Sequence, residues 1–242
     1  MLDGDFQVDS ATVSGLVLDF PHVVFAPLHY EPGYAYPLVV WLHGSGDDER
    51  QLPRIMPLVS MRNYLAVAPR GLCLPDERNK HGWLQTEDHI QQAEQRVFDC
   101  IELACRKFRV HPGRVFLAGF SHGGTMAMRI GLSHPGRFAG VVSLGGAIPK
   151  GGALLGNLAM ARRLGFFFAS GRVSREYPTS HVCEDLRLLH AAGLSITLRQ
   201  YPCGQELMPQ MLADVDRWII DQIAPPQVAA AAVSNCEWSC DE

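Results

Sequence analysis

The chain has 242 residues, 47% of them hydrophobic, and its 21 basic and 25 acidic residues give a net charge of -4. This length and apolar content suffice for the core of one α/β domain. No basic tract is present that would bind nucleic acid or anionic lipid, and no apolar run approaches the ~20 residues that cross a bilayer. We therefore expect neither a nucleic-acid partner nor a membrane span.

The sequence also shows no recognisable targeting signal and no closely spaced cysteine pair of the C-x-x-C type. The first residues carry no basic segment followed by an apolar one, and the seven cysteines include no C-x-x-C pair. Reduced thiols in a cytoplasmic protein are the expectation. Cys236 and Cys240 near the C-terminus are the exception, and their role stays open. No His-Asp-Glu cluster has metal spacing and no G-x-G-x-x-G follows the first strand, so we expect no metal and no cofactor.

Strand-like and helix-like segments alternate along the chain. Apolar runs predict strands over residues 22–28, 37–44, 64–69, 114–118, 138–144, 165–169 and 195–201. Helical spacing predicts helices over 55–61, 87–108, 125–133, 179–192 and 207–223. The helix over 87–108 is expected to bury one face, made of Ile90, Val97, Ile101, Ala104, Cys105 and Phe108.

This alternation predicts an α/β fold, a mostly parallel sheet covered by helices on both faces. We expect a single domain over residues 22–223, an N-terminal extension over 1–21, and a disordered tail over 224–242.

The most informative segment joins a strand to a helix at residues 119–123, which read Gly-Phe-Ser-His-Gly. In this G-x-S-x-G setting a sharp turn holds a serine hydroxyl at the edge of the sheet, above the first turn of the helix. The two glycines keep side chains away from the turn, where a Cβ would collide. Ser121 is therefore the candidate nucleophile.

Two further segments complete a family pattern. Residues 42–46 read Leu-His-Gly-Ser-Gly at the end of a buried strand, and residues 201–204 read Tyr-Pro-Cys-Gly after the last expected strand. With the turn at Ser121, they resemble the α/β-hydrolase fold and, within it, the phospholipase/carboxylesterase family of serine esterases, related to dienelactone-hydrolase-like and prolyl-oligopeptidase-like esterases. The resemblance spans residues 22–223. It implies a small ester or acyl substrate, and the N–H groups of Ser45 and His122 as oxyanion-hole donors.

The resemblance also implies an acid and a histidine after the serine. The family follows a late core strand with His-Gly-x-x-Asp and then a proline. In residues 166–178 Gly171 and Pro178 fall in register, and Ser174 takes the place of the Asp. The histidine position in the later loop is held by Gln205. Whatever the register, no histidine follows His190, so the usual segment lacks an imidazole base.

Replacements for the missing groups stay open. His122 and His181 could supply a base, and Glu176 or Glu206 could act as a carboxylate base or acid. The ordinary interpretation of His122 is an amide donor at a helix start, and that of both glutamates is surface solvation. The sequence thus supports two hypotheses: a serine carboxylesterase or thioesterase with a degenerate triad and weakened activity, or a catalytically silent relative that binds a ligand or protein partner.

Overall fold

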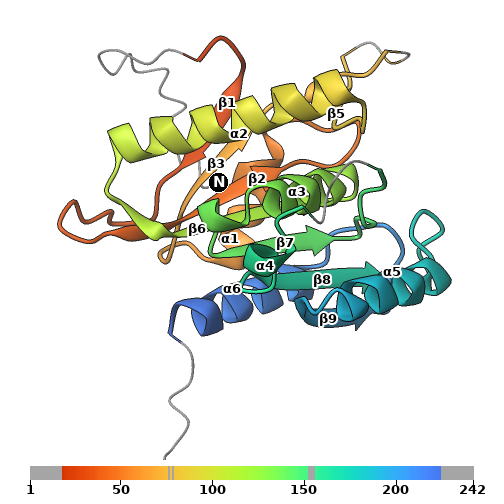
Figure 1. Cartoon of the computed structure of the whole chain (residues 1–242). Coiled ribbons are helices and arrows are strands. Elements are labelled where there is room, and N and C mark those ends of the chain that lie inside the picture. Colours follow the sequence, from red (N-terminus) through yellow and green to blue (C-terminus); the bar gives the residue numbers. More distant parts are fainter. Residues whose placement is uncertain (1–17, 76, 78, 152–155, 225–242) are drawn as a thin grey trace, which may run out of the picture.

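The computed structural model describes residues 18–75, 77, 79–151 and 156–224. Residues 1–17 and 225–242, which hold most of the expected N-terminal extension and tail, lie outside the described residues, as do Cys236 and Cys240. Seven strands form one sheet in the order β1-β3-β2-β6-β7-β8-β9. Figure 1 shows this twisted sheet between two layers of helices. The predicted α/β class with a mostly parallel sheet is confirmed.

The sheet is parallel except at one edge. Its strands are β1 (His22–Phe25), β2 (Tyr36–Leu42), β3 (Leu65–Pro69), β6 (Val110–Phe120), β7 (Gly140–Leu144), β8 (Gly165–Gly171) and β9 (Ser195–Tyr201). Only β1 runs antiparallel, against β3. Every residue of β2, β3 and β7 is buried, as expected for central strands that have helices on both faces.

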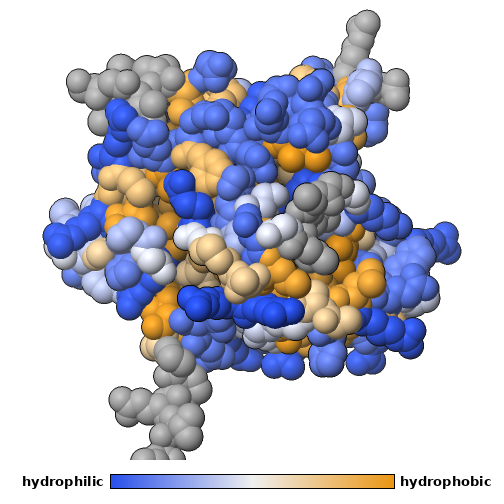
Figure 2. All heavy atoms as spheres, viewed as in Figure 1, coloured by the Kyte–Doolittle hydropathy of each residue, from blue (hydrophilic) through white to orange (hydrophobic). Residues whose placement is uncertain are grey.

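The helices cover the two faces unequally. Core residues of α2 (Glu87–Lys107), α3 (His122–Ser133), α4 (Leu158–Ala161) and α5 (Thr179–Ala191) pack in one apolar cluster, and those of α1 (Gln51–Val59) and α6 (Pro209–Ile223) pack in the other. A single-turn 3₁₀ helix, η1 (Pro135–Arg137), follows α3. In Figure 2 the surface over α2 is mainly hydrophilic, as its solvent-facing side requires.

The inner face of α2 differs from the expected one. Its buried residues are Ala93, Val97, Cys100 and Ala104, whereas Cys105 is exposed. Each helical residue turns the side-chain direction by about 100°, so Cys105 points well away from the row that includes Ala104. The assignment of Cys105 to the buried face was therefore wrong.

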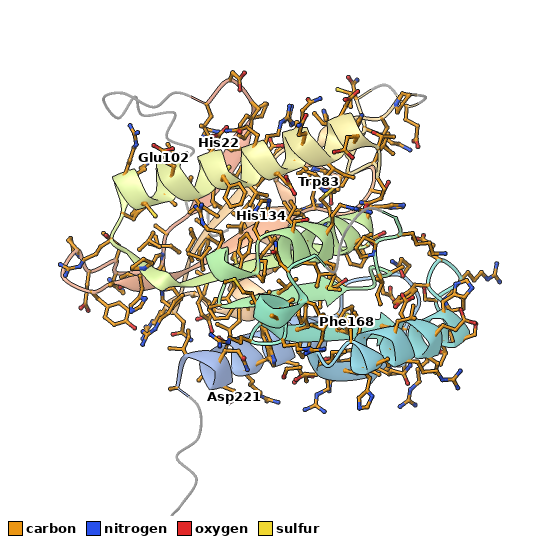
Figure 3. All side chains as sticks on the ribbon, viewed as in Figure 1. His22, Trp83, Glu102, His134, Phe168 and Asp221 are labelled. Atoms are coloured by element: carbon orange, nitrogen blue, oxygen red, sulfur yellow. The ribbon has the colours of Figure 1, made fainter. Side chains whose placement is uncertain are left out.

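The segment between β3 and α2 contains structure that periodicity could not reveal. A short antiparallel pair, β4 (Leu72–Cys73) and β5 (His81–Gly82), lies within it. Trp83 follows β5, is 1% exposed, and donates from Nε1 to the carbonyl oxygen of His43 over 2.9 Å. Figure 3 shows Trp83 close to the N-terminal end of α2. This tryptophan therefore ties the segment to the end of β2 as part of the core.

Candidate functional site

Ser121 occupies a strained turn between β6 and α3. Its backbone has φ 51° and ψ -123°, a region that non-glycine residues rarely adopt. Its N–H donates to the carbonyl oxygen of Leu144 over 2.8 Å, which fixes the turn against β7. A Cβ on Gly119 would lie 2.4 Å from the carbonyl carbon of Gly123, so the turn closes only with glycine there. Ser121 as a whole residue is 8% exposed and counts as buried.

The start of α3 packs directly on the end of β2. A Cβ at Gly123 would lie 2.2 Å from the carbonyl oxygen of Leu42 and 2.4 Å from that of His43. This contact brings the segment with Ser45 beside the turn with Ser121. In the described part of the chain, no hydrogen-bond acceptor engages the N–H of Ser45 or of His122. The unbonded N–H of His122 belongs to the first turn of α3, where a helix offers its N–H groups to an oxygen atom.

His43 holds the segment before Ser45 in place. The buried imidazole bonds the carbonyl oxygen of Gly44 through Nδ1 over 2.8 Å, and its Nε2 accepts the N–H of Gly71 over 2.8 Å. A ring with one nitrogen donating and the other accepting is neutral. Burial lowers the pKa of His43, which agrees with that state. His43 is thus a structural support and is not free to take a proton from Ser121.

Ser174 and Gln205 contact each other at the same end of the sheet. The Ser174 hydroxyl lies 2.8 Å from Oε1 of Gln205, and Nε2 of Gln205 lies 2.7 Å from the carbonyl oxygen of Gly145. A carbonyl only accepts, so the group facing Gly145 must be the amide NH₂. The N–H of Tyr177 donates to the Ser174 oxygen over 3.1 Å, which leaves the hydroxyl hydrogen for Gln205.

The resulting chain of hydrogen bonds, from the Tyr177 N–H through Ser174 and Gln205 to Gly145, is called the amide relay below. It ends close to Ser121, because Gly145 follows Leu144, whose carbonyl oxygen accepts the Ser121 N–H. A Cβ on Gly145, which has φ 64°, would lie 2.9 Å from Nε2 of Gln205. The amide therefore packs tightly against the end of β7.

Within the part of the chain that the structure describes, no base is bonded to Ser121. Among the described residues, no hydrogen bond reaches its hydroxyl oxygen. The side chains considered as replacements, His122, His181, Glu176 and Glu206, are all exposed. None of them forms a hydrogen bond to Ser121 or Gln205 in the described ranges. The described residues thus place a serine at this turn without a hydrogen-bonded proton acceptor.

Sequence reasoning missed two members of the relay. Gly145 and Tyr177 contribute backbone groups, and a backbone group leaves no residue-type signal. Gly145 was detectable only as a glycine directly after a predicted strand. Within the described ranges, no cluster of three His, Cys, Asp or Glu side chains could hold a metal ion, and no helix is long and apolar enough to cross a membrane.

A strand–serine–helix turn at the carboxyl edge of a mostly parallel sheet, beside a second glycine turn, defines an α/β-hydrolase. The phospholipase/carboxylesterase family model matches residues 33–222, and the chain belongs to that family.

Two relatives with known sequences are named after esterases, and one of these names calls the protein inactive. NocK of Nocardia uniformis subsp. tsuyamanensis, named as a candidate esterase, is 30% identical over 134 residues, which cover 51% of this chain and 38% of NocK. A protein of Oryza sativa subsp. japonica named as a probable inactive carboxylesterase is 24% identical over 205 residues, which cover 75% of this chain and 82% of the rice protein.

Solved structures share the fold. A carboxylesterase from Mesorhizobium loti has a TM-score of 0.68 at 18% identity and covers 85% of this chain and 97% of its own. The Bacillus cereus carboxylesterase has a TM-score of 0.67 at 17% identity, with 84% and 95% covered. SOBER1 of Arabidopsis thaliana has a TM-score of 0.63 at 19% identity, with 78% and 100% covered.

Proposed function

We propose that this protein binds the carbonyl group of an ester or acyl ligand at Ser121 and does not hydrolyse it at the rate of an enzyme with a complete triad. The N–H groups of Ser45 and His122 serve as the donors to the carbonyl oxygen. The observation that carries the proposal is the amide relay, in which Gln205 bonds Ser174 and the backbone of Gly145. The family resemblance expects a histidine at position 205 and an acid at position 174.

The chemistry of the amide decides against efficient turnover. A serine hydroxyl attacks a carbonyl only as a base removes its proton, and imidazole does so because its pKa lies near neutrality. A glutamine amide takes up no proton at physiological pH. Enzymes that lose triad members keep only about 10³–10⁴-fold of acceleration over water, which comes from the oxyanion hole and from binding. We expect the same residual level here.

An active serine esterase is the second candidate, and one observation favours it. Ser121 keeps a strained backbone with φ 51°, and strain of this kind costs on the order of 1–3 kcal/mol and clusters at active sites. In this case a side chain such as His181 would approach Ser121 once a ligand is bound.

A fluorophosphonate probe distinguishes the two candidates, because it reports the nucleophilicity of Ser121 without any assumption about the substrate. We expect labelling, followed by intact mass, to be at least about 10⁴-fold slower than in a carboxylesterase with a complete triad, because a wrong tautomer of the histidine alone costs about that much. Rapid labelling that Ser121→Ala abolishes would establish the active candidate instead.

Binding is tested separately by nuclear magnetic resonance. Ethyl butyrate should shift the amide signals of Ser45 and His122 in a saturable way, without appearance of butyrate. Unchanged amide signals at saturating ester would refute the proposed carbonyl site.

A further inference from the structure

A cavity of about 490 Å³ lies away from Ser121, between the start of the described chain, the β4–β5 pair and the N-terminal half of α2. The lining residues that matter for its chemistry are Pro21, Leu72, Cys73, His81, His89 and Arg96. Neither Ser121 nor Gln205 lines it. Its volume falls within the range of about 300–1,000 Å³ that small-molecule sites occupy.

Arg96 is a charged group of this cavity that backbone oxygens and an aromatic ring hold in place. Its Nη1 donates to the carbonyl oxygens of Arg70 and Gly71, over 2.6 Å and 3.2 Å, and its guanidinium lies 5.0 Å from the ring centre of Phe20. Among the described residues, no carboxylate forms an ion pair with Arg96, and no acceptor bonds its Nε or Nη2. The stacking on Phe20 and the hydrogen bonds from Nη1 hold the guanidinium in one orientation. Its N–H groups at Nε and Nη2 are therefore already oriented for a ligand before it binds.

The neighbouring charges do not neutralise this group through a direct contact. Arg70 forms an ion pair with Glu49 and donates two hydrogen bonds of 2.6 Å to its carboxylate. Asp19 is exposed and acts on Arg96 only as a nearby charge, beyond ion-pair distance. Burial lowers the pKa of Arg96, so this cation is partly desolvated without a bonded anion. A charge in that state gains from an anionic partner.

Two histidines line the cavity together with Arg70, Gln92 and Arg96. His81 and His89 both line the cavity, and Nδ1 of His89 is buried with no hydrogen-bond partner among the described residues. A buried polar atom left without a partner costs on the order of 1–3 kcal/mol. Pro21 and Leu72 supply apolar surface beside them. Apolar walls with a few convergent polar groups are the usual composition of a ligand site.

We propose that this cavity is a second ligand site, which binds a small organic anion. The carboxylate or phosphate head of the ligand accepts hydrogen bonds from Nε and Nη2 of Arg96. Its apolar body lies against Pro21 and Leu72. The cavity is distinct from the proposed carbonyl site, because Ser121, Ser45 and His122 do not line it.

Isothermal titration calorimetry of the full chain tests the proposal with three probes: phenyl phosphate, benzoate and inorganic phosphate. Phenyl phosphate or benzoate should bind saturably, and comparison of the two identifies the preferred head group. Inorganic phosphate should bind at least tenfold more weakly than phenyl phosphate, because it lacks the apolar body. Equal affinity for these two phosphates would contradict an organic ligand.

Variants locate the bound probe. Arg96→Gln should weaken binding at least tenfold, since each lost charge-assisted hydrogen bond is worth more than a neutral one. Arg106→Gln removes the same charge from an exposed position on the same helix and should change the affinity less than twofold. Because Arg96 also supports Gly71, a second variant is needed: Cys73→Glu adds a negative charge at an exposed lining position and should weaken binding about tenfold.

Three results would overturn the proposal. The first is that neither organic anion binds saturably to the wild-type protein. The second is that Arg96→Gln and Cys73→Glu both bind the anion as tightly as the wild type does. The third is that Ser121→Ala loses binding. The last result would place the anion at the carbonyl site. The calorimetric outcome does not depend on hydrolysis, so the second site and the proposed function fail separately.

Discussion

The hydroxyl of Ser174 donates a hydrogen bond to the side-chain oxygen of Gln205 over 2.8 Å. In a catalytic triad the direction is opposite, because the imidazole Nδ1–H donates to the carboxylate and thereby leaves Nε2 free to accept the serine proton. The reversed direction here has a consequence for restoring activity. A histidine placed at position 205 beside a donor hydroxyl would accept at Nδ1 and carry its proton on Nε2, which is the wrong tautomer.

We therefore expect strong non-additivity between two substitutions. Gln205→His alone and Ser174→Asp alone should each leave hydrolysis of p-nitrophenyl butyrate within a few-fold of wild type. The double variant should exceed wild type by at least a hundredfold, because a wrong tautomer costs about 10⁴-fold in an established triad. Adding Ser121→Ala to the double variant must remove the gain. A double variant no faster than its parents would show that Ser174 and Gln205 are not the triad positions.

The amide relay should also contribute to stability. Gln205→Leu leaves the Ser174 hydroxyl and the Gly145 carbonyl without their side-chain partner, so the free energy of unfolding should fall by about 1–3 kcal/mol. Urea denaturation followed by circular dichroism measures this change. Gln95→Leu is the matched control, because Gln95 is exposed and bonds only Asp99 on its own helix. If Gln205→Leu lowered the free energy of unfolding by less than about 0.5 kcal/mol, the result would contradict a stabilising amide relay.

The contact between α3 and β2 makes Gly123 intolerant of any side chain. In Gly123→Ala the added Cβ would meet two backbone oxygens at 2.2 Å and 2.4 Å, and backbone cannot move aside as a flexible side chain can. We expect a loss of about 1–3 kcal/mol or more in unfolding free energy. Gly33→Ala serves as the control, since a Cβ added at Gly33 would have no atom of the described residues within 4 Å. Equal melting temperatures for the two variants would argue against this packing.

The neutral state of His43 predicts a pH dependence of stability. Burial lowers its pKa in the folded protein below the ordinary value of 6.5, so the unfolded chain binds the proton more readily. The stabilising contribution is complete above about pH 6.5 and is lost as the pH falls toward the folded-state pKa, by up to about 1.4 kcal/mol per pH unit. Burial lowers the pKa of His81 in the same direction, so part of the effect is not due to His43.

Urea unfolding at pH 7.5 and pH 5.5 measures this dependence. The stability difference between the two pH values should be smaller in His43→Gln than in wild type. His190→Gln, which alters an exposed histidine at the end of α5, should keep the full difference. If His43→Gln retains it as well, the buried imidazole does not account for the loss in acid.

Most of the fold was predictable because continuous apolar runs and helical periodicity are set by burial, which the sequence records residue by residue. The strands over 37–44 and 64–69 correspond to β2 and β3, and the helix over 87–108 to α2. The predicted burial of Cys105 was wrong because a shift of one residue along a helix turns the side chain by about 100°, from an inner to an outer position. The β4–β5 pair is held by contacts with the rest of the fold rather than by its own pattern.

The site was predictable in part. The family frame selected Ser174 and Gln205, two residues in separate loops, and the structure joins them by a hydrogen bond; their correspondence to the triad stays a prediction. The partners of Gln205 could not be foreseen, because Gly145 and Tyr177 take part through their backbones. The cavity around Arg96 was also hidden, since it draws on three segments that only the folded chain brings together.

The amide relay contains no group that gains or loses a proton between pH 5 and pH 9, because a peptide N–H, a hydroxyl, a carboxamide and a peptide carbonyl are all neutral throughout that range. The imidazole of a catalytic triad, in contrast, gains a proton in mild acid and then no longer accepts one from the serine. The loops that carry Ser174, Gln205 and Gly145 are joined by bonds whose own groups keep their protonation state from pH 5 to pH 9. Any effect of acid at this edge of the sheet should therefore enter through the His43 side and not through the amide relay.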